Sequence, residues 1–230
     1  MTREEIVGYL EQTNLDPALT RKQIDYQIDM ALRLKTKGLC ITPAWVYHAK
    51  KRLEGSGILV VTVPNWELGG GLERCTRNDD AYVLADEVDY IWDIVHFAHV
   101  KNYKVNEHEL AEIRKATKGV LKIIVETTMM RMIAEKTGAD YEAMLKLAVE
   151  MINASGADFI KTDSGLAPRN VERGILDLYQ DVEIMKKYST KPIKASAGIR
   201  HVKEVEKLLE LGAVRIGTSR AENIIREIED

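Results

Sequence analysis

The strongest constraint on the fold is the regular alternation of short β-type runs with longer helix-type runs along the chain. The strand candidates are an inconspicuous run near Thr13 to Leu15 and the runs Leu39 to Thr42, Ile58 to Val63, Glu87 to Asp93, Leu121 to Thr127, Asp158 to Thr162, Pro192 to Ser196 and Val214 to Gly217. The helical periodicities between them include Arg21 to Lys35, Glu107 to Thr117, Tyr141 to Ser155, Val171 to Lys187 and Val202 to Leu211. This alternation favours a parallel sheet covered by helices.

About eight strand–helix units without a dinucleotide-binding glycine fingerprint favour a closed barrel over an open sheet. The chain has 230 residues, of which 45% are hydrophobic, and this length suits one such domain. The first residues, Met1 to Glu5, open like an amphipathic helix. We therefore predict an α/β fold, a single (β/α)₈ TIM barrel over residues 1–230 with a short N-terminal helix.

Composition excludes several classes of partner. The net charge is −3, the basic residues are spread along the chain and only two Phe occur, so nucleic acid is not an expected partner. No apolar run approaches the length of a membrane span. Cys40 and Cys75 lie far apart without metal-type spacing, which is typical of a reducing cytoplasm. We expect a cytoplasmic protein that acts on a small molecule.

Two predicted strands carry a lysine late in the strand. Because side chains alternate along a strand, Lys161 faces away from Ile160 and Lys194 faces away from Ile193, so both lysines are expected inside the barrel. Asp89 is expected on the inner face of the fourth strand. Charged inner residues near the carboxyl ends of barrel strands meet at the mouth, where barrel enzymes react.

Other inner charges are interpreted as structural. Glu87 shares a face with Asp89, and Lys122 and Glu126 share one face of the fifth strand. We expect these three side chains to be paired ions in a polar barrel interior.

Lys161 and Lys194 are expected to repel each other. At about 4 Å and an effective dielectric constant of about 20, two like charges cost roughly 4 kcal/mol, enough to favour a neutral amine on one of them near physiological pH. Such an amine is a nucleophile for a carbonyl group. Asp89 can balance the remaining ammonium group and relay protons.

Glycine-containing turns follow three of the last strands. They are Ser164-Gly165, Ala197-Gly198-Ile199 and Gly217-Thr218-Ser219. Glycine lets backbone amides approach an anion, and the loops after the seventh and eighth strands are the usual phosphate site in barrels. The glycines of the loop Pro64 to Gly71 do not match a P-loop, and we interpret that segment as a barrel-top loop.

These segments, in this order, resemble the deoxyribose-phosphate aldolase family along most of the chain. The matching segments are Asp86 to Asp89, Leu121 to Thr127, Ala157 to Thr162, Ile193 to Arg200 and Arg215 to Ser219, with looser matches at Thr13 to Pro17 and Leu39 to Pro43. The resemblance implies that Lys161 forms a Schiff base, that Lys194 is the second lysine and that Asp89 is the catalytic aspartate.

The reaction that the resemblance implies is reversible cleavage of 2-deoxy-D-ribose 5-phosphate to acetaldehyde and D-glyceraldehyde 3-phosphate. The imine is the electron sink, so no metal or other cofactor is expected. Residues expected to contact the phosphate or the rest of the substrate are Thr13, Cys40, Ser164, Gly165, Ala197, Gly198, Gly217, Ser219 and Arg220.

The chain departs from the family pattern around the expected phosphate site. Asp163 interrupts a Ser/Thr-rich triplet after Lys161, Ala197 replaces the first of two glycines, and Arg220 replaces a serine. Asp163 would repel a phosphate, whereas Arg220 or Arg169 could bind one. A class I aldolase for another, non-phosphorylated aldehyde pair is therefore the leading alternative.

Two further hypotheses remain open. A metal site could use His96 and His99 with His108, although solvent-facing histidines are favoured because a third converging ligand is not evident. A barrel that only binds a metabolite is disfavoured by the lysine pair. Association into homo-oligomers is compatible with the aromatic residues, which fit core or pocket packing equally well: Trp45, Tyr47, Trp66 and Trp92.

Overall fold

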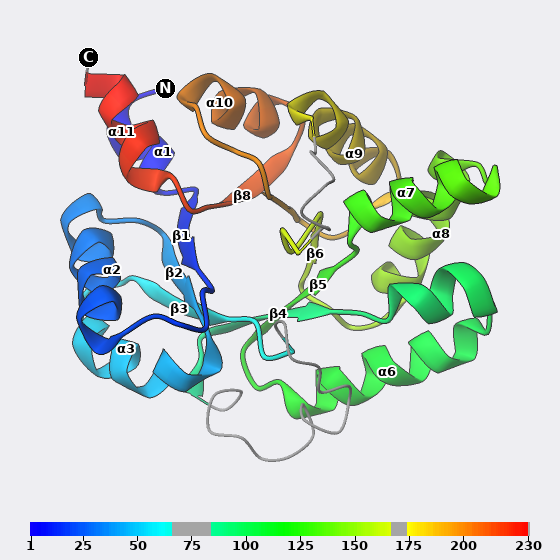
Figure 1. Cartoon of the computed structure of the whole chain (residues 1–230), viewed down its shortest axis with the longest axis horizontal. Helices are drawn as coiled ribbons and strands as arrows, with labels where there is room; N and C mark the ends of the chain where they lie inside the picture. Colours follow the sequence, from blue (N-terminus) through cyan, green and yellow to red (C-terminus); the bar gives the residue numbers. More distant parts are fainter. Residues whose placement is uncertain (66–83, 167–173, 230) are drawn as a thin grey trace.

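The computed structural model describes residues 1–65, 84–166 and 174–229. Eight parallel strands are hydrogen-bonded in sequence order, and β8 pairs with β1 to close a barrel (Figure 1). The strands are β1 (Leu10–Asn14), β2 (Gly38–Ile41), β3 (Leu59–Thr62), β4 (Glu87–Ile91), β5 (Val120–Ile124), β6 (Phe159–Lys161), β7 (Ile193–Ser196) and β8 (Ala213–Thr218). The predicted TIM barrel is confirmed.

Helices surround the barrel (Figure 1). They are α1 (Arg3–Val7), α2 (Arg21–Leu34), α3 (Val46–Leu53), α6 (Tyr103–Ala116), α7 (Thr127–Thr137), α8 (Tyr141–Ala154), α9 (Ile175–Tyr188), α10 (Val202–Glu210) and α11 (Ala221–Glu229). Two single turns, η1 (Pro43–Trp45) and η2 (His96–Val100), complete the pattern. The predicted N-terminal helix is α1, and it begins with a reciprocal cap in which Thr2 and Glu5 bond each other's backbone amides.

Alternation along the strands separates an outer core from the barrel interior. Leu39, Val60 and Ile160 point outward and are buried in the main core together with the inner faces of the helices. Their neighbours Cys40 and Val61 belong instead to a small apolar cluster inside the barrel. The interior also holds buried charged side chains, among them Asp89, Lys122 and Lys194, so a charged cluster lies within an apolar shell.

Element boundaries differ from the predictions at several points. The first strand begins at Leu10, earlier than the run near Thr13. The fifth strand ends at Ile124, and Thr127 opens α7, because Glu126 adopts a left-handed conformation with φ of 60° that cannot continue a strand.

Some predicted features lie outside the described residues. Most of the loop Pro64 to Gly71 belongs to residues 66–83, as does Cys75. The start of the helix predicted over Val171 to Lys187 falls in residues 167–173, as does Arg169. Asn65 is described, and its side-chain amide bonds both the carbonyl and the N–H of Ile91 at 2.7 and 3.2 Å, which ties the end of β3 to the end of β4.

Candidate active site

The register of the barrel brings the predicted charged residues together inside it. Lys161 lies opposite Lys194 across the β6–β7 pair, and Asp89 lies opposite Lys122 across the β4–β5 pair. All four side chains are buried. They point inward from four consecutive strands, so the inner-face positions predicted from the alternation of side chains along each strand are correct for all four.

Asp89 is the centre of this cluster. Its Oδ2 accepts hydrogen bonds from the Nζ atoms of both Lys161 and Lys194 at 2.8 Å, and its Oδ1 accepts one from Lys122 Nζ at 2.8 Å. Burial opposes ionisation of Asp89, but the three ammonium groups outweigh it and hold the pKa of Asp89 well below its usual range. Asp89 is therefore a fixed negative charge that both lysines share.

Lys194 has a second carboxylate partner, Glu11, to which its Nζ donates a hydrogen bond. Burial alone would lower the pKa of Lys194, yet the Asp89 and Glu11 carboxylates together raise it above its ordinary value. Lys194 is thus held as a cation. Glu11 was not singled out from the sequence, although it lies on β1 among the inner residues.

A ring of ion pairs completes the cluster. Lys122 Nζ lies 2.5 Å from Glu87 Oε2 and 3.7 Å from Glu11 Oε1. Arg215 closes the ring, with its Nη1 3.2 Å from Glu11 Oε1 and its Nη2 3.5 Å from Glu87 Oε1. Glu87 and Lys122 are therefore paired ions, as expected from the sequence.

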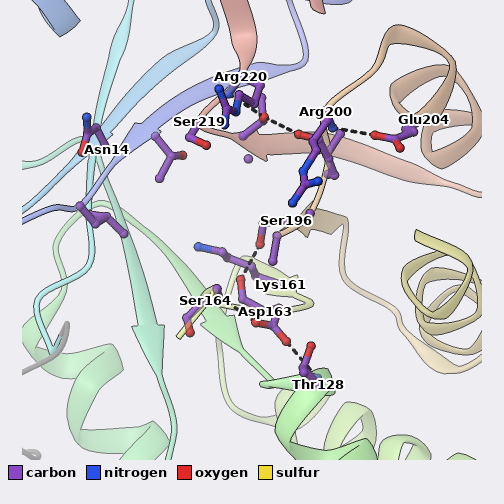
Figure 2. A pocket seen from close by; sticks show the side chains of 18 of the residues that line it. Asn14, Thr128, Lys161, Asp163, Ser164, Ser196, Arg200, Glu204, Ser219 and Arg220 are labelled. Carbon is purple, nitrogen blue, oxygen red and sulfur yellow. Dashed lines mark hydrogen bonds between the residues drawn. The ribbon is translucent and has the colours of Figure 1, made fainter. Parts of the chain in front are cut away.

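A cavity of about 810 Å³ opens at the carboxyl ends of β1, β6, β7 and β8, with Lys161 in its wall (Figure 2). It is lined by most of the residues that were expected to contact substrate, namely Thr13, Ser164, Gly165, Ala197, Gly198, Gly217, Ser219 and Arg220. Cys40 is the exception, since it is fully buried in the apolar cluster inside the barrel, where burial raises its pKa to about 11. Asp89 and Lys194 lie below the cavity surface.

The turns after β7 and β8 have restricted conformations. Ala197 and Gly198 both adopt left-handed conformations, with φ of 75° and 78°, so glycine is the natural residue at the first position too. A Cβ at Gly217 would lie 3.1 Å from both Lys194 Cε and Ser196 Cβ. Gly217 therefore leaves the space that the Lys194 side chain occupies.

Two arginines lie at the edge of the cavity, and sequence reasoning singled out only Arg220. Arg200 and Arg220 are exposed, and no carboxylate among the described residues forms an ion pair with either guanidinium group. Arg220 immediately precedes α11, whose first N–H groups add positive potential to the same side of the opening. This side of the cavity is suited to an anion.

The opposite wall is acidic. Asp163 follows β6 and caps α7, because its Oδ2 accepts the Thr128 N–H at 2.9 Å and its Oδ1 accepts the Gly165 N–H at 2.8 Å. Next to it, Glu126 Oε1 accepts the Ser164 N–H at 3.0 Å. Burial, reinforced by the charge of Asp163, raises the pKa of Glu126 to about 8, so Glu126 differs from Glu87 and Lys122 and is not the paired ion expected from the sequence.

The metal hypothesis gains no support from the described part of the chain. No three His, Cys, Asp or Glu side chains there gather in a way that could hold a metal ion. His96 is half-buried in the turn η2, and its Nδ1 is 3.3 Å from Asp93 Oδ2. Within the same residues, every helix falls short of the length and apolarity that a membrane crossing needs.

The aromatic residues divide between core and surface. Trp92 is buried and its Nε1 donates to the carbonyl of Val125 at 3.1 Å, and Trp45 packs against the core. Tyr47 is 70% exposed. Trp66 lies outside the described residues. Of the three that the structure describes, Tyr47 is thus the one whose side chain is largely accessible to another molecule.

Known proteins resemble this chain over almost its whole length. It is 33% identical over 226 residues to the deoxyribose-phosphate aldolase of Metamycoplasma arthritidis, with 96% of each chain covered. It is 31% identical over 225 residues to deoxyribose-phosphate aldolase 2 of Staphylococcus aureus, covering 96% of this chain and 95% of that one. No protein-family model matches the chain.

Solved structures agree with these relatives. The aldolase QR15 superposes with a TM-score of 0.82 at 28% identity and covers 98% of this chain and 96% of its own. The deoxyribose phosphate aldolase of Aeropyrum pernix, described as a tetramer, superposes with a TM-score of 0.81 at 21% identity, covering 100% and 93%, and shares the fold. With this identity and coverage to its curated relatives, the chain belongs to the deoxyribose-phosphate aldolase family, a family of lyases.

Proposed function

We propose that this protein is a class I aldolase that cleaves 2-deoxy-D-ribose 5-phosphate reversibly to acetaldehyde and D-glyceraldehyde 3-phosphate through a Schiff base on Lys161. The observation that carries the proposal is the position of Lys161: its Nζ bonds the buried Asp89 carboxylate, and its side chain lines the cavity. The names of the curated relatives support the substrate.

The charge balance of the cluster favours a neutral amine on Lys161. Four cationic side chains share three carboxylates: Lys122, Lys161, Lys194 and Arg215 against Glu11, Glu87 and Asp89. Loss of one proton therefore leaves the cluster neutral. Arg215 does not deprotonate in proteins, and Lys122 and Lys194 each have more than one carboxylate partner. Among the carboxylates of the described residues, Lys161 forms an ion pair with Asp89, so it has fewer charged partners than the other two lysines.

The role of Lys194 differs from simple repulsion between two neighbouring ammonium groups. Both lysines bond the same oxygen of Asp89, which offsets much of that repulsion. With four cationic side chains and three carboxylates, the cluster still carries one positive charge that no carboxylate balances, and Lys194 contributes to this charge. We propose that Lys194 acts as a fixed cation and that Asp89 orients both lysines and takes part in proton transfer through water.

The chemical step follows from these roles. The neutral amine of Lys161 bonds to C1 of the open-chain sugar. The carbonyl oxygen then leaves as water with one proton of the amine and one proton taken from solvent, which gives the protonated imine. The C3 hydroxyl then passes its proton to the water through which Asp89 is proposed to act. C3 becomes the aldehyde carbon of glyceraldehyde 3-phosphate, and the C2–C3 bonding electrons move into the imine to form an enamine. Protonation of C2 and hydrolysis release acetaldehyde and regenerate Lys161.

The phosphate is proposed to bind on the β7–β8 side of the cavity. Arg200 and Arg220 supply positive charge, and the turns at Gly198 and Ser219 supply backbone close to the opening. Both the turns and the first N–H groups of α11 are suited to an oxyanion. Asp163 lies across the cavity from these groups, where its charge disfavours phosphate.

A direct test measures both products from 2-deoxyribose 5-phosphate. Wild-type protein is expected to release acetaldehyde and glyceraldehyde 3-phosphate in equal amounts, and Lys161→Met is expected to release neither. The matched control is Lys136→Met, which removes an exposed lysine of α7. Turnover by Lys161→Met at a rate close to that of wild type would refute the assignment.

A non-phosphorylated aldehyde pair is the second candidate, because Asp163 gives the cavity an acidic wall. A comparison of 2-deoxyribose 5-phosphate with 2-deoxyribose distinguishes the two. The first candidate predicts a preference of at least a hundredfold in kcat/KM for the phosphate ester, reduced in Arg220→Ser. A preference for the free sugar would favour the second.

We also propose that the protein forms homo-oligomers in the cytoplasm. The relative from Aeropyrum pernix is described as a tetramer, and Tyr47 offers an exposed aromatic side chain. The buried thiol of Cys40 fits a reducing compartment. Sedimentation velocity tests the first point, since a single species at the mass of one chain would contradict it.

A further inference from the structure

A buried hydroxyl without a hydrogen-bond partner lies in the cavity wall, beside the loop that follows Lys161. Thr128 is the second residue of α7 and is only 6% exposed, and its Oγ1 bonds no atom of the described residues. Figure 2 shows the Thr128 side chain at the lower wall of the cavity, next to Asp163. Buried hydroxyl groups normally have a partner, and an atom of a ligand bound at this wall can supply the missing one.

Asp163 gives the same wall a fixed hydrogen-bond acceptor. The N–H groups of Thr128 and Gly165 orient its two carboxylate oxygens at 2.9 and 2.8 Å. A carboxylate oxygen accepts more than one donor, so a ligand hydroxyl can also donate to it. The negative charge repels an anion. The Thr128 hydroxyl can donate a hydrogen bond and the Asp163 carboxylate can accept one. Together they suit an uncharged ligand hydroxyl, which can both accept and donate a hydrogen bond.

Strand order places this wall on the other side of Lys161 from the anion-binding turns. Thr128 follows β5, Lys161 ends β6, and the turns at Gly198 and Ser219 follow β7 and β8. A substrate joined to Lys161 through its imine carbon and extending towards those turns directs the remaining substituent of that carbon towards β5. In acetaldehyde this substituent is a hydrogen atom, whereas in a ketone it is a carbon group.

We propose that Thr128 and Asp163 form a donor-side subsite that recognises the hydroxymethyl group of an α-hydroxy ketone, so that the enzyme accepts hydroxy ketones as carbonyl donors. This inference rests on the proposed imine at Lys161. The neutral amine bonds to the ketone carbon, and its two protons leave with the carbonyl oxygen as water. The imine then holds the hydroxymethyl group against Thr128.

The test compares hydroxyacetone with butanone, which carries a methyl group in place of the hydroxyl. Cyanoborohydride trapping on Lys161 is followed by mass spectrometry, and the half-saturating concentration of each ketone is measured. The ratio of the butanone value to the hydroxyacetone value is compared among wild type, Thr128→Val and Thr128→Ser. Valine keeps the shape of threonine without its hydroxyl, and serine keeps the hydroxyl.

The subsite predicts that this ratio falls at least tenfold in Thr128→Val and stays within about threefold of wild type in Thr128→Ser. An equal ratio in wild type and Thr128→Val would overturn the subsite, because intrinsic carbonyl reactivity would then explain any preference. Acetaldehyde separates this failure from that of the proposed function. If acetaldehyde labels Lys161 while the ratio is unchanged, only the subsite is wrong. If no carbonyl compound labels Lys161, the Schiff-base proposal fails, and the subsite fails with it.

Discussion

Replacement of Glu126 by glutamine should make the protein increasingly more stable than wild type as the pH rises. Burial and the neighbouring Asp163 raise the pKa of Glu126 from an ordinary 4.5 to about 8. Between these values the unfolded chain has lost the Glu126 proton while the folded chain retains it. The free energy of unfolding therefore falls as the pH rises through this window, and the full penalty is present above pH 8.

The size of the effect follows from the two pKa values. At about 1.4 kcal/mol per pH unit, the interval from 4.5 to about 8 corresponds to at most about 5 kcal/mol. Because Glu126 and Asp163 interact, this figure is an upper bound for Glu126 alone. Glutamine cannot ionise, and its carbonyl oxygen can still accept the Ser164 N–H.

Urea unfolding followed by circular dichroism at pH 5, 6, 7 and 8 measures this difference. We expect the free energy of unfolding of Glu126→Gln minus that of wild type to increase by several kcal/mol across the series. Glu135→Gln, at an exposed position of α7, the helix that follows Glu126, is the matched control and should run parallel to wild type. If the free energies of unfolding of Glu126→Gln and wild type depended on pH in the same way, the reasoning would be refuted, because Glu126 would then titrate alike in the folded and unfolded chains.

Three further predictions concern the cluster and its surroundings. Lys194→Met leaves three cations for three carboxylates, so trapping of acetaldehyde on Lys161 at pH 7 should fall at least roughly tenfold and recover towards alkaline pH; an unchanged pH profile would show that Lys194 has no electrostatic role. Gly217→Ala places a Cβ 3.1 Å from Lys194 Cε, and we expect kcat to fall at least tenfold while urea unfolding still shows one cooperative transition; wild-type kcat would contradict the packing argument. EDTA should leave turnover of 2-deoxyribose 5-phosphate unchanged, whereas a loss that one added metal restores would favour the histidine hypothesis.

Strand parity explains why the central residues were predictable from the sequence. Lys161 and Lys194 each follow an outward-facing isoleucine, and a closed barrel directs both to the same interior. Parity alone does not give depth along the barrel axis. Cys40 was expected to contact substrate, yet it is fully buried in the apolar cluster inside the barrel, because access to the cavity depends on which neighbouring side chains cover a residue.

Glu11 and Arg215 escaped sequence analysis for a different reason. The strand Leu10–Asn14 has the sequence Leu-Glu-Gln-Thr-Asn, which has one apolar residue and thus no alternating signal. Its polar side chains are stabilised by partners from distant strands, such as Lys194 for Glu11. In the same way, the start of α7 was predicted as strand because its first residues are β-branched, and the cap that Asp163 provides comes from another loop.

The central claim is that Lys161 forms the Schiff base, and borohydride reduction with acetaldehyde tests it most directly. Peptide mapping after reduction should find an ethyl group on Lys161 in wild type, and Lys161→Met should show no specific labelling. Asp89→Asn should still be labelled although its turnover is lost, because the carboxylate is proposed to serve proton transfer after the imine forms. Labelling of Lys194 alone would reverse the two lysine roles, and labelling of neither lysine would contradict the Schiff-base mechanism.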